Sequence, residues 1–152
     1  MPEQLSFAGL DAAPRPTDRV FFAIFPDTSA AADMAQLAQT LRGEHGLKGR
    51  ALAPGRFHVT LHHLGDYVGL PQGIVSAAGE AAAAVVTSSF DVAFDRVVSF
   101  SGRSRNRPFV LRGGDGVEAL ITFQQSLGVA MKKAGLGCWA APQYTTACDP
   151  TV

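Results

Sequence analysis

The order of its short apolar runs and helical segments constrains the fold of this chain more than any other feature. The run RVFFAIF at residues 19–25 is aromatic, β-branched and bounded by turn residues, which is typical of a buried strand. Strands are also predicted at 57–64, 90–100, 108–112 and 139–146. Helices are predicted from a cap at residues 27–29 to Gly43, over 70–87 and over 117–134. Strands 90–100 and 108–112 are consecutive and are therefore expected to form a hairpin.

Composition narrows the class of protein. The 152 residues are 47% hydrophobic, and the 13 basic and 13 acidic side chains cancel, so bulk charge does not favour coating of nucleic acid or of an acidic membrane. Two cysteines are too few for a disulfide framework and suggest a reducing, cytoplasmic setting. No run reaches the roughly 18 apolar residues of a membrane span. Residues 1–18 are expected to be a flexible leader, followed by a single domain over 19–152.

Three of the four histidines lie in one octapeptide, FHVTLHHL, at residues 57–64. On a helix, His58 and His62 would share a face and could bind one metal ion. On a strand the same two residues lie about 13 Å apart, at ~3.3 Å per residue, which is too far for two ligands of one zinc ion. The composition of the octapeptide favours a strand, so a metal-dependent hydrolase is the weakest of the functional hypotheses.

Alternation along this predicted strand brings His58, Thr60 and His62 to one face and leaves residues 57, 59, 61 and 63 on the other. Neighbours at i and i+2 lie roughly 6–7 Å apart, so an imidazole and a hydroxyl at this spacing can hold one phosphate together. The imidazole can transfer a proton, while the hydroxyl donates a hydrogen bond to a non-bridging oxygen. His58 and Thr60 are therefore candidate catalytic residues.

The tetrapeptide HVTL at residues 58–61 resembles the first His-x-Thr-x motif of the two-histidine phosphoesterases. The segments RVFFAIFPD, RFHVTLHHLGD and RPFVLR, in this order, and the helix 117–134 resemble in particular the bacterial RNA 2′,3′-cyclic phosphodiesterases, also called 2′-5′ RNA ligases. The resemblance implies an α+β fold. Two lobes, each an antiparallel sheet with flanking helices, would face each other around a central cleft, and each would supply one His-x-Thr-x strand.

The second motif departs from the family pattern. Where a second His-x-Thr-x is implied, the chain reads PQYTT, so Gln143 stands at the histidine position and Thr145 at the threonine position. The family mechanism implies that His58 protonates the leaving ribose 3′ oxygen and that the second histidine accepts a proton from the attacking water. Gln143 can hydrogen-bond a phosphate but cannot accept that proton. The loss of a general base costs about 10²–10⁴ in rate, or roughly 3–5 kcal/mol of barrier.

The resemblance also implies further secondary structure after the second motif, which would complete the sheet. We therefore expect the domain over 19–152 to be incomplete at its C-terminal end, with open sheet edges. A truncated chain, a shifted reading frame and a degenerate family member would each give this pattern. The coding DNA downstream of codon 152 distinguishes the three explanations.

Two basic segments flank the proposed site along the chain. Residues 42–56 carry four basic residues and one acid, and residues 96–112 carry five arginines and no acid. Most surface arginines are simply solvated, but arginine can form two parallel hydrogen bonds with a phosphate. Arg105 and Arg107 are the arginines that we expect to contact the substrate phosphate.

Together, the motifs and the resemblance predict an enzyme that hydrolyses RNA 2′,3′-cyclic phosphate termini to 2′-phosphates without a metal ion or other cofactor. The predicted substrate contacts are Gln143, Thr145, Arg105 and Arg107. The alternative is a catalytically inactive domain that binds RNA ends or nucleotide phosphates. The expected partners are RNA ends or cyclic nucleotide phosphates, with no membrane and no obligate protein partner.

Overall fold

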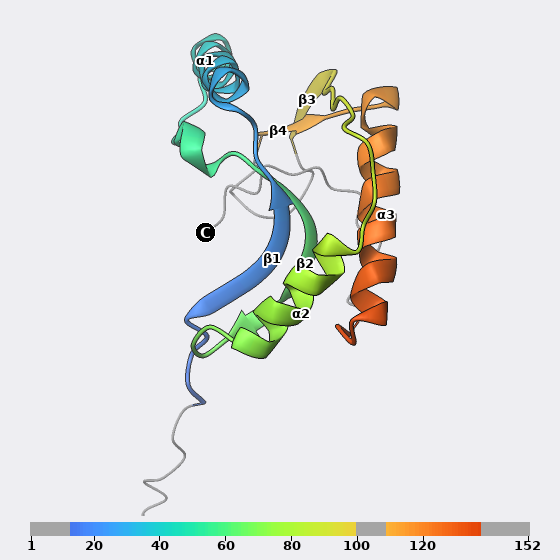
Figure 1. Cartoon of the computed structure of the whole chain (residues 1–152). Helices are drawn as coiled ribbons and strands as arrows, with labels where there is room; N and C mark the ends of the chain where they lie inside the picture. The colour runs from blue at the N-terminus through green and yellow to red at the C-terminus, as the bar shows by residue number, and fades with distance from the viewer. Residues whose placement is uncertain (1–12, 100–108, 138–152) are drawn as a thin grey trace, which may run out of the picture.

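Figure 1 shows the computed structural model, which describes residues 13–99 and 109–137 of the chain. Its first elements are β1 (Asp18–Ile24), α1 (Thr28–Glu44), the 3₁₀ turn η1 (Pro54–Arg56), β2 (Val59–Tyr67) and α2 (Gln72–Ala83). Then come β3 (Arg96–Ser99), β4 (Phe109–Arg112), the 3₁₀ turn η2 (Asp115–Val117) and α3 (Glu118–Lys133). β1 pairs with β2 and β3 pairs with β4, each pair antiparallel. The predicted α+β class, with two antiparallel sheets and flanking helices, is confirmed.

The β1–β2 ribbon contains two irregularities that change which side chains share a face. Ile24 pairs with Val59 at one end and Asp18 with Tyr67 at the other, but Leu61 and Leu64 of β2 have no partner in β1. Each of these residues is the extra residue of a β-bulge. Beyond such a bulge, the side chains of β2 point to the opposite faces from those that strict alternation predicts. A strict alternation along β2 therefore fails after Thr60.

The second bulge also explains why β2 is longer than its sequence predicts. The sequence predicts that the strand ends at residue 64, yet β2 continues through Gly65 and Asp66 to Tyr67. Gly65 has a φ of 143°, and a Cβ atom there would lie 2.8 Å from the Tyr67 hydroxyl oxygen. Glycine is thus the residue that this bulge requires, and it bends the strand instead of ending it.

The core lies between the β1–β2 ribbon and the helices α2 and α3. Phe22 and Ile24 of β1 pack against the buried side chains, as does Val59 of β2. The two alanines of α2 in this core are small enough to allow close packing. The buried members of the cluster are Leu61, Ala78, Ala81, Leu120, Leu127, Met131 and Leu136. One face of the ribbon is therefore the core face, and its opposite face is the one that can present polar groups.

Helix α1 follows β1 after a short cap, as the sequence predicts. The side chain of Asp27 accepts a hydrogen bond from the Ala30 N–H at 2.8 Å, which satisfies one of the free donors of the first turn. His45 is the C-cap, and its N–H donates to the Leu41 carbonyl at 3.0 Å. Figure 1 shows α1 and η1 at the end of the ribbon where β1 finishes and β2 begins.

The predicted strand at 90–100 is wrong in its first half, since β3 begins only at Arg96. Phe90 turns toward α3 instead, where its ring lies 5.9 Å from the ring of Phe123. Packing on the core thus overrides the period-two pattern of this segment. The predicted helix 70–87 is shorter in the structure, because Pro71 and Ala84 are its caps.

The described residues do not include most of the predicted leader or any of the last predicted strand. Residues 1–12 of the expected leader and the predicted strand 139–146 lie outside the described residues, so both stay predictions. In the described ranges, no helix is long and apolar enough to cross a membrane.

Candidate active site

His58 stands immediately before β2, at the end of the ribbon that faces α1 and η1. The residue before it, Phe57, is only 7% exposed, and its N–H donates to the Pro54 carbonyl at 3.2 Å. Burial of Phe57 anchors the chain where it enters the strand. Because neighbouring side chains alternate along an extended chain, this anchor turns His58 away from the core.

A backbone hydrogen bond decides which nitrogen of His58 is available. The Nδ1 atom lies 2.8 Å from the carbonyl oxygen of Arg56. A carbonyl oxygen can only accept, so Nδ1 carries the proton and donates it. In the neutral ring Nε2 is then the basic nitrogen, and it becomes a donor when the imidazolium forms. Among the residues that the structure describes, none is hydrogen-bonded to Nε2.

Thr60 shares the face of His58. Thr60 pairs with Ala23, and cross-strand partners point to the same face of a sheet. Phe21 lies two residues before Ala23, on the same face, and its ring centroid is 5.4 Å from that of His58. The register is consistent with an imidazole and a hydroxyl at i and i+2 on one face, and the site they would form stays a prediction.

Two aromatic rings contact His58, and sequence reasoning did not identify either of them as part of the site. The centroid of Phe21 lies 5.4 Å and that of Phe25 lies 5.9 Å from the imidazole centroid, both with tilted rings. Phe21 is 36% exposed and Phe25 is 66% exposed. The signal was present in RVFFAIF, because period-two alternation puts Phe21, Ala23 and Phe25 on the face opposite to the core residues.

His62 does not share the face of His58, which corrects the simple alternation. The bulge at Leu61 pairs His62 with Phe22, a residue of the core face. Its Nε2–H donates to the carbonyl of Gln124 in α3 at 2.8 Å, and the Gln124 amide donates in return to the Leu61 carbonyl at 3.0 Å. His62 therefore fastens β2 to α3.

His63 takes part in a charged cluster farther along the ribbon. Its Nε2 lies 3.2 Å from Asp66 Oδ1, the same oxygen that Arg19 contacts at 2.8 Å from the neighbouring strand. The Arg19 guanidinium, with His63 second, holds the pKa of Asp66 below its usual value of 3.8. The described residues contain no group of three or more His, Cys, Asp or Glu side chains that could hold a metal ion.

The positive charge of the second basic segment, residues 96–112, is partly neutralised by an acidic neighbour. Arg96 pairs across the hairpin with Arg112, but the side chain of Asp95 contacts Arg96 at 2.6 Å. This contact lowers the pKa of Asp95 and raises that of Arg96. Asp95 also accepts a hydrogen bond from the Gly114 N–H at 3.0 Å. Counting charges from residue 96 onward missed this partner, which lies one position upstream.

The remaining predicted site residues cannot be placed. Arg105 and Arg107 belong to the predicted turn between β3 and β4, and Gln143 and Thr145 to the predicted second motif. All four lie outside the described residues, so their contacts with a substrate stay predictions.

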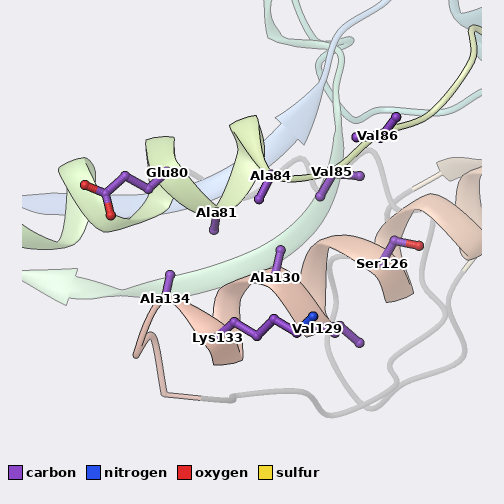
Figure 2. A pocket seen from close by; sticks show the side chains of 10 residues that line it. All are labelled: Glu80, Ala81, Ala84, Val85, Val86, Ser126, Val129, Ala130, Lys133 and Ala134. Carbon is purple, nitrogen blue, oxygen red and sulfur yellow. The ribbon is translucent and has the colours of Figure 1, made fainter.

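A shallow groove elsewhere in the molecule contains none of the predicted site residues. Figure 2 shows the side chains that line it, from α2, α3 and the residues after α2. Its volume is about 350 Å³. Seven of its ten lining residues are Ala or Val, and the others are Glu80, Ser126 and Lys133. Its lining contains no histidine, and it lies along the core helices α2 and α3.

The fold and the motif strand define an α+β protein with a half-buried histidine–threonine pair on one face of an antiparallel ribbon. Comparison with known families agrees with this class. Residues 24–110, more than half of the chain, match the family model described as LigT like Phosphoesterase. The chain therefore belongs to the LigT-like phosphoesterase family. No curated protein and no solved structure matches it.

Proposed function

We propose that this chain is a phosphoesterase that opens the 2′,3′-cyclic phosphate at an RNA end to give a 2′-phosphate, in the cytoplasm and without a metal ion. Membership of the LigT-like phosphoesterase family supports phosphoester chemistry. The substrate, the direction of opening and the His-x-Thr-x mechanism are the parts that we add.

The observation that carries the proposal is the hydrogen bond between His58 Nδ1 and the Arg56 carbonyl, 2.8 Å long. It directs the exchangeable proton of the imidazolium to Nε2, on the face that also presents Thr60. An imidazolium proton there can be given to the ribose 3′ oxygen as its bond to phosphorus breaks and the oxygen of the attacking water bonds to phosphorus in its place. The proton that this water loses passes to solvent, because Gln143 cannot accept it. The Thr60 hydroxyl can donate a hydrogen bond to a non-bridging phosphate oxygen.

Gln143 favours a second candidate function. In the resemblance it replaces the histidine that would accept a proton from the attacking water, and an amide cannot do so. Arg105, Arg107 and Thr145 would then serve with Gln143 to bind a phosphate that is not hydrolysed. The second candidate is therefore a catalytically inactive domain that holds RNA ends or nucleotide phosphates.

Turnover of a 2′,3′-cyclic nucleotide, with and without a chelator, separates the two functions. The enzyme predicts a 2′-phosphate product, formed at the same rate with chelator and lost in His58→Ala. Absence of turnover together with retained binding of the nucleotide supports the binding domain. Loss of turnover on chelation contradicts both and favours a metal-dependent hydrolase.

Restoring the second histidine sharpens the assay. Gln143→His is expected to raise turnover by about 10²–10⁴-fold, the contribution of one general base. Gln143→Asn, which keeps an amide, is the matched control and is expected to give no gain. No gain from Gln143→His would contradict the assignment of this position.

A further inference from the structure

We propose that Phe25 is the stacking platform for the nucleobase of the nucleotide whose phosphate His58 contacts. The proposal rests on the proposed function and adds a base-binding site beside the phosphate site. It gives a function to an aromatic side chain that does not pack in the hydrophobic core.

The exposure of Phe25 is the first argument. At 66% exposed, it is the most exposed aromatic side chain in the described part of the chain. A Phe ring buries a large apolar area when it is covered, so leaving it in water forgoes that stabilisation. Phe22 and Ile24, its neighbours in the same run, do pack against the core.

The backbone on both sides of Phe25 is also restrained, which suits a platform. Phe25 follows directly on β1 and precedes Pro26, which restricts the backbone of the residue before it to extended conformations. The next residue, Asp27, is fixed as the N-cap of α1 by its 2.8 Å hydrogen bond from the Ala30 N–H. Phe25 thus sits between a paired strand and a capped helix.

Its position relative to His58 is the third argument. The two ring centroids lie 5.9 Å apart, so a ligand that contacts Nε2 of His58 has an aromatic surface as its neighbour. In a cyclic nucleotide the ribose carries both the phosphate and the base, so the base must lie close to the phosphate site. Phe21, at 5.4 Å and 36% exposed, is the less accessible ring and supports the imidazole instead.

The chemistry of the platform predicts which feature of the ligand matters. Stacking on a phenylalanine ring uses the π face that every nucleobase has, and it is tolerant of sequence. The ligand class is therefore any nucleobase attached to the phosphate-bearing ribose, with purines and pyrimidines both accepted.

Calorimetric binding to the full chain tests this without requiring turnover. The probes are a nucleoside 2′-monophosphate and ribose 2-phosphate, which lacks the base. In Phe25→Leu the nucleotide is expected to bind about 5–150-fold more weakly, the range for one lost base–aromatic stack, while the affinity for ribose 2-phosphate stays unchanged. Phe25→Trp should retain the preference for the base. Phe109→Leu, at a ring that is 40% exposed, is the matched control and should change neither affinity.

The outcomes separate this proposal from the proposed function. Equal weakening of both probes in Phe25→Leu, no change in either, or no preference of the wild-type chain for the nucleotide would each overturn the platform. A base preference that depends on Phe25, in a chain that shows no turnover of cyclic nucleotides, supports the platform and contradicts the enzyme. Circular dichroism of each variant confirms that the exposed substitution leaves the fold intact.

Discussion

Histidines stand immediately before β2 and in its middle, and the two places give the imidazole rings different partners. Immediately before β2, the Nδ1–H of His58 donates to a backbone carbonyl, and no described residue is hydrogen-bonded to its Nε2. Farther along, His62 is fastened to the Gln124 carbonyl and His63 to Asp66, each through Nε2. The nitrogen that is available in the first ring is therefore the one that is occupied in the other two.

This difference teaches that a cluster of histidines in the sequence does not define one site. Backbone geometry distributes the three rings, since the bulge at Leu61 turns His62 toward α3 and leaves Thr60 on the opposite face. The start of β2 is suited to chemistry and the remainder to structure. The following substitutions test that division, from the largest expected effect to the smallest.

His58→Asn is expected to have the largest effect. The amide can still donate to the Arg56 carbonyl, but it cannot supply a proton at the position of Nε2, so turnover of a cyclic nucleotide should fall by about 10²–10⁴-fold. Chemical denaturation should show the free energy of unfolding changed by less than about 1 kcal/mol. Retained turnover in His58→Asn would contradict the functional role of His58. So would a loss of turnover that is explained by a lowered free energy of unfolding.

Thr60→Val keeps the shape of the side chain and removes its hydroxyl. A hydrogen bond to a charged phosphate contributes about 1.5–3 kcal/mol, so kcat/KM should fall about 10–150-fold. Thr40→Val is the matched control, because its hydroxyl bonds a carbonyl within α1 at the Gln36 position. An equal loss in both variants would show that the effect is not specific to the proposed site.

His62→Ala reverses the pattern expected of His58. Loss of the hydrogen bond to the Gln124 carbonyl should lower the free energy of unfolding by about 0.5–1.5 kcal/mol, with turnover per folded molecule unchanged. Gln124→Ala breaks the reciprocal bond to Leu61 and should have a similar effect, measured by urea denaturation. If His62→Ala instead lost turnover at unchanged stability, the assignment of the two histidines would have to be exchanged.

Asp66→Asn is expected to have the smallest effect and to be visible only through pH. The neighbouring Arg19, and then His63, lower the pKa of Asp66 in the folded chain. The carboxylate therefore contributes stability above its unfolded-state pKa, and that contribution is lost as the pH falls through the lowered value. Thermal unfolding as a function of pH should become flatter in this acidic range in the variant. An unchanged profile would show that the cluster at this end contributes nothing measurable.

Local rules were sufficient where the sequence carries its own signal. A helix cap within residues 27–29, the strand that begins beside His58 and the stripe of α3 that contains Leu127 all follow from residue type and spacing. The same holds for the His58–Thr60 pair, because no bulge intervenes between them.

The remainder depends on contacts between distant residues, which spacing does not encode. The bulges at Leu61 and Leu64 arise from pairing with β1, and they decide the face of His62.

 Phe90 leaves the predicted strand because its ring packs against that of Phe123 in α3, with the centroids 5.9 Å apart. The aromatic contacts of His58 likewise join residues of β1 and β2 that only the folded ribbon brings together.

The imidazole nitrogen spectrum of the three histidines, recorded by NMR during a titration with a nucleoside 2′-monophosphate, tests the central claim most directly. The account predicts that His58 alone is protonated at Nδ1 in its neutral form, and that the ligand shifts the Nε2 resonance of His58. The Nε2 resonances of His62 and His63 should show N–H donors and stay in place. A neutral His58 protonated at Nε2, or a ligand that shifts His62 or His63 instead, would contradict the account.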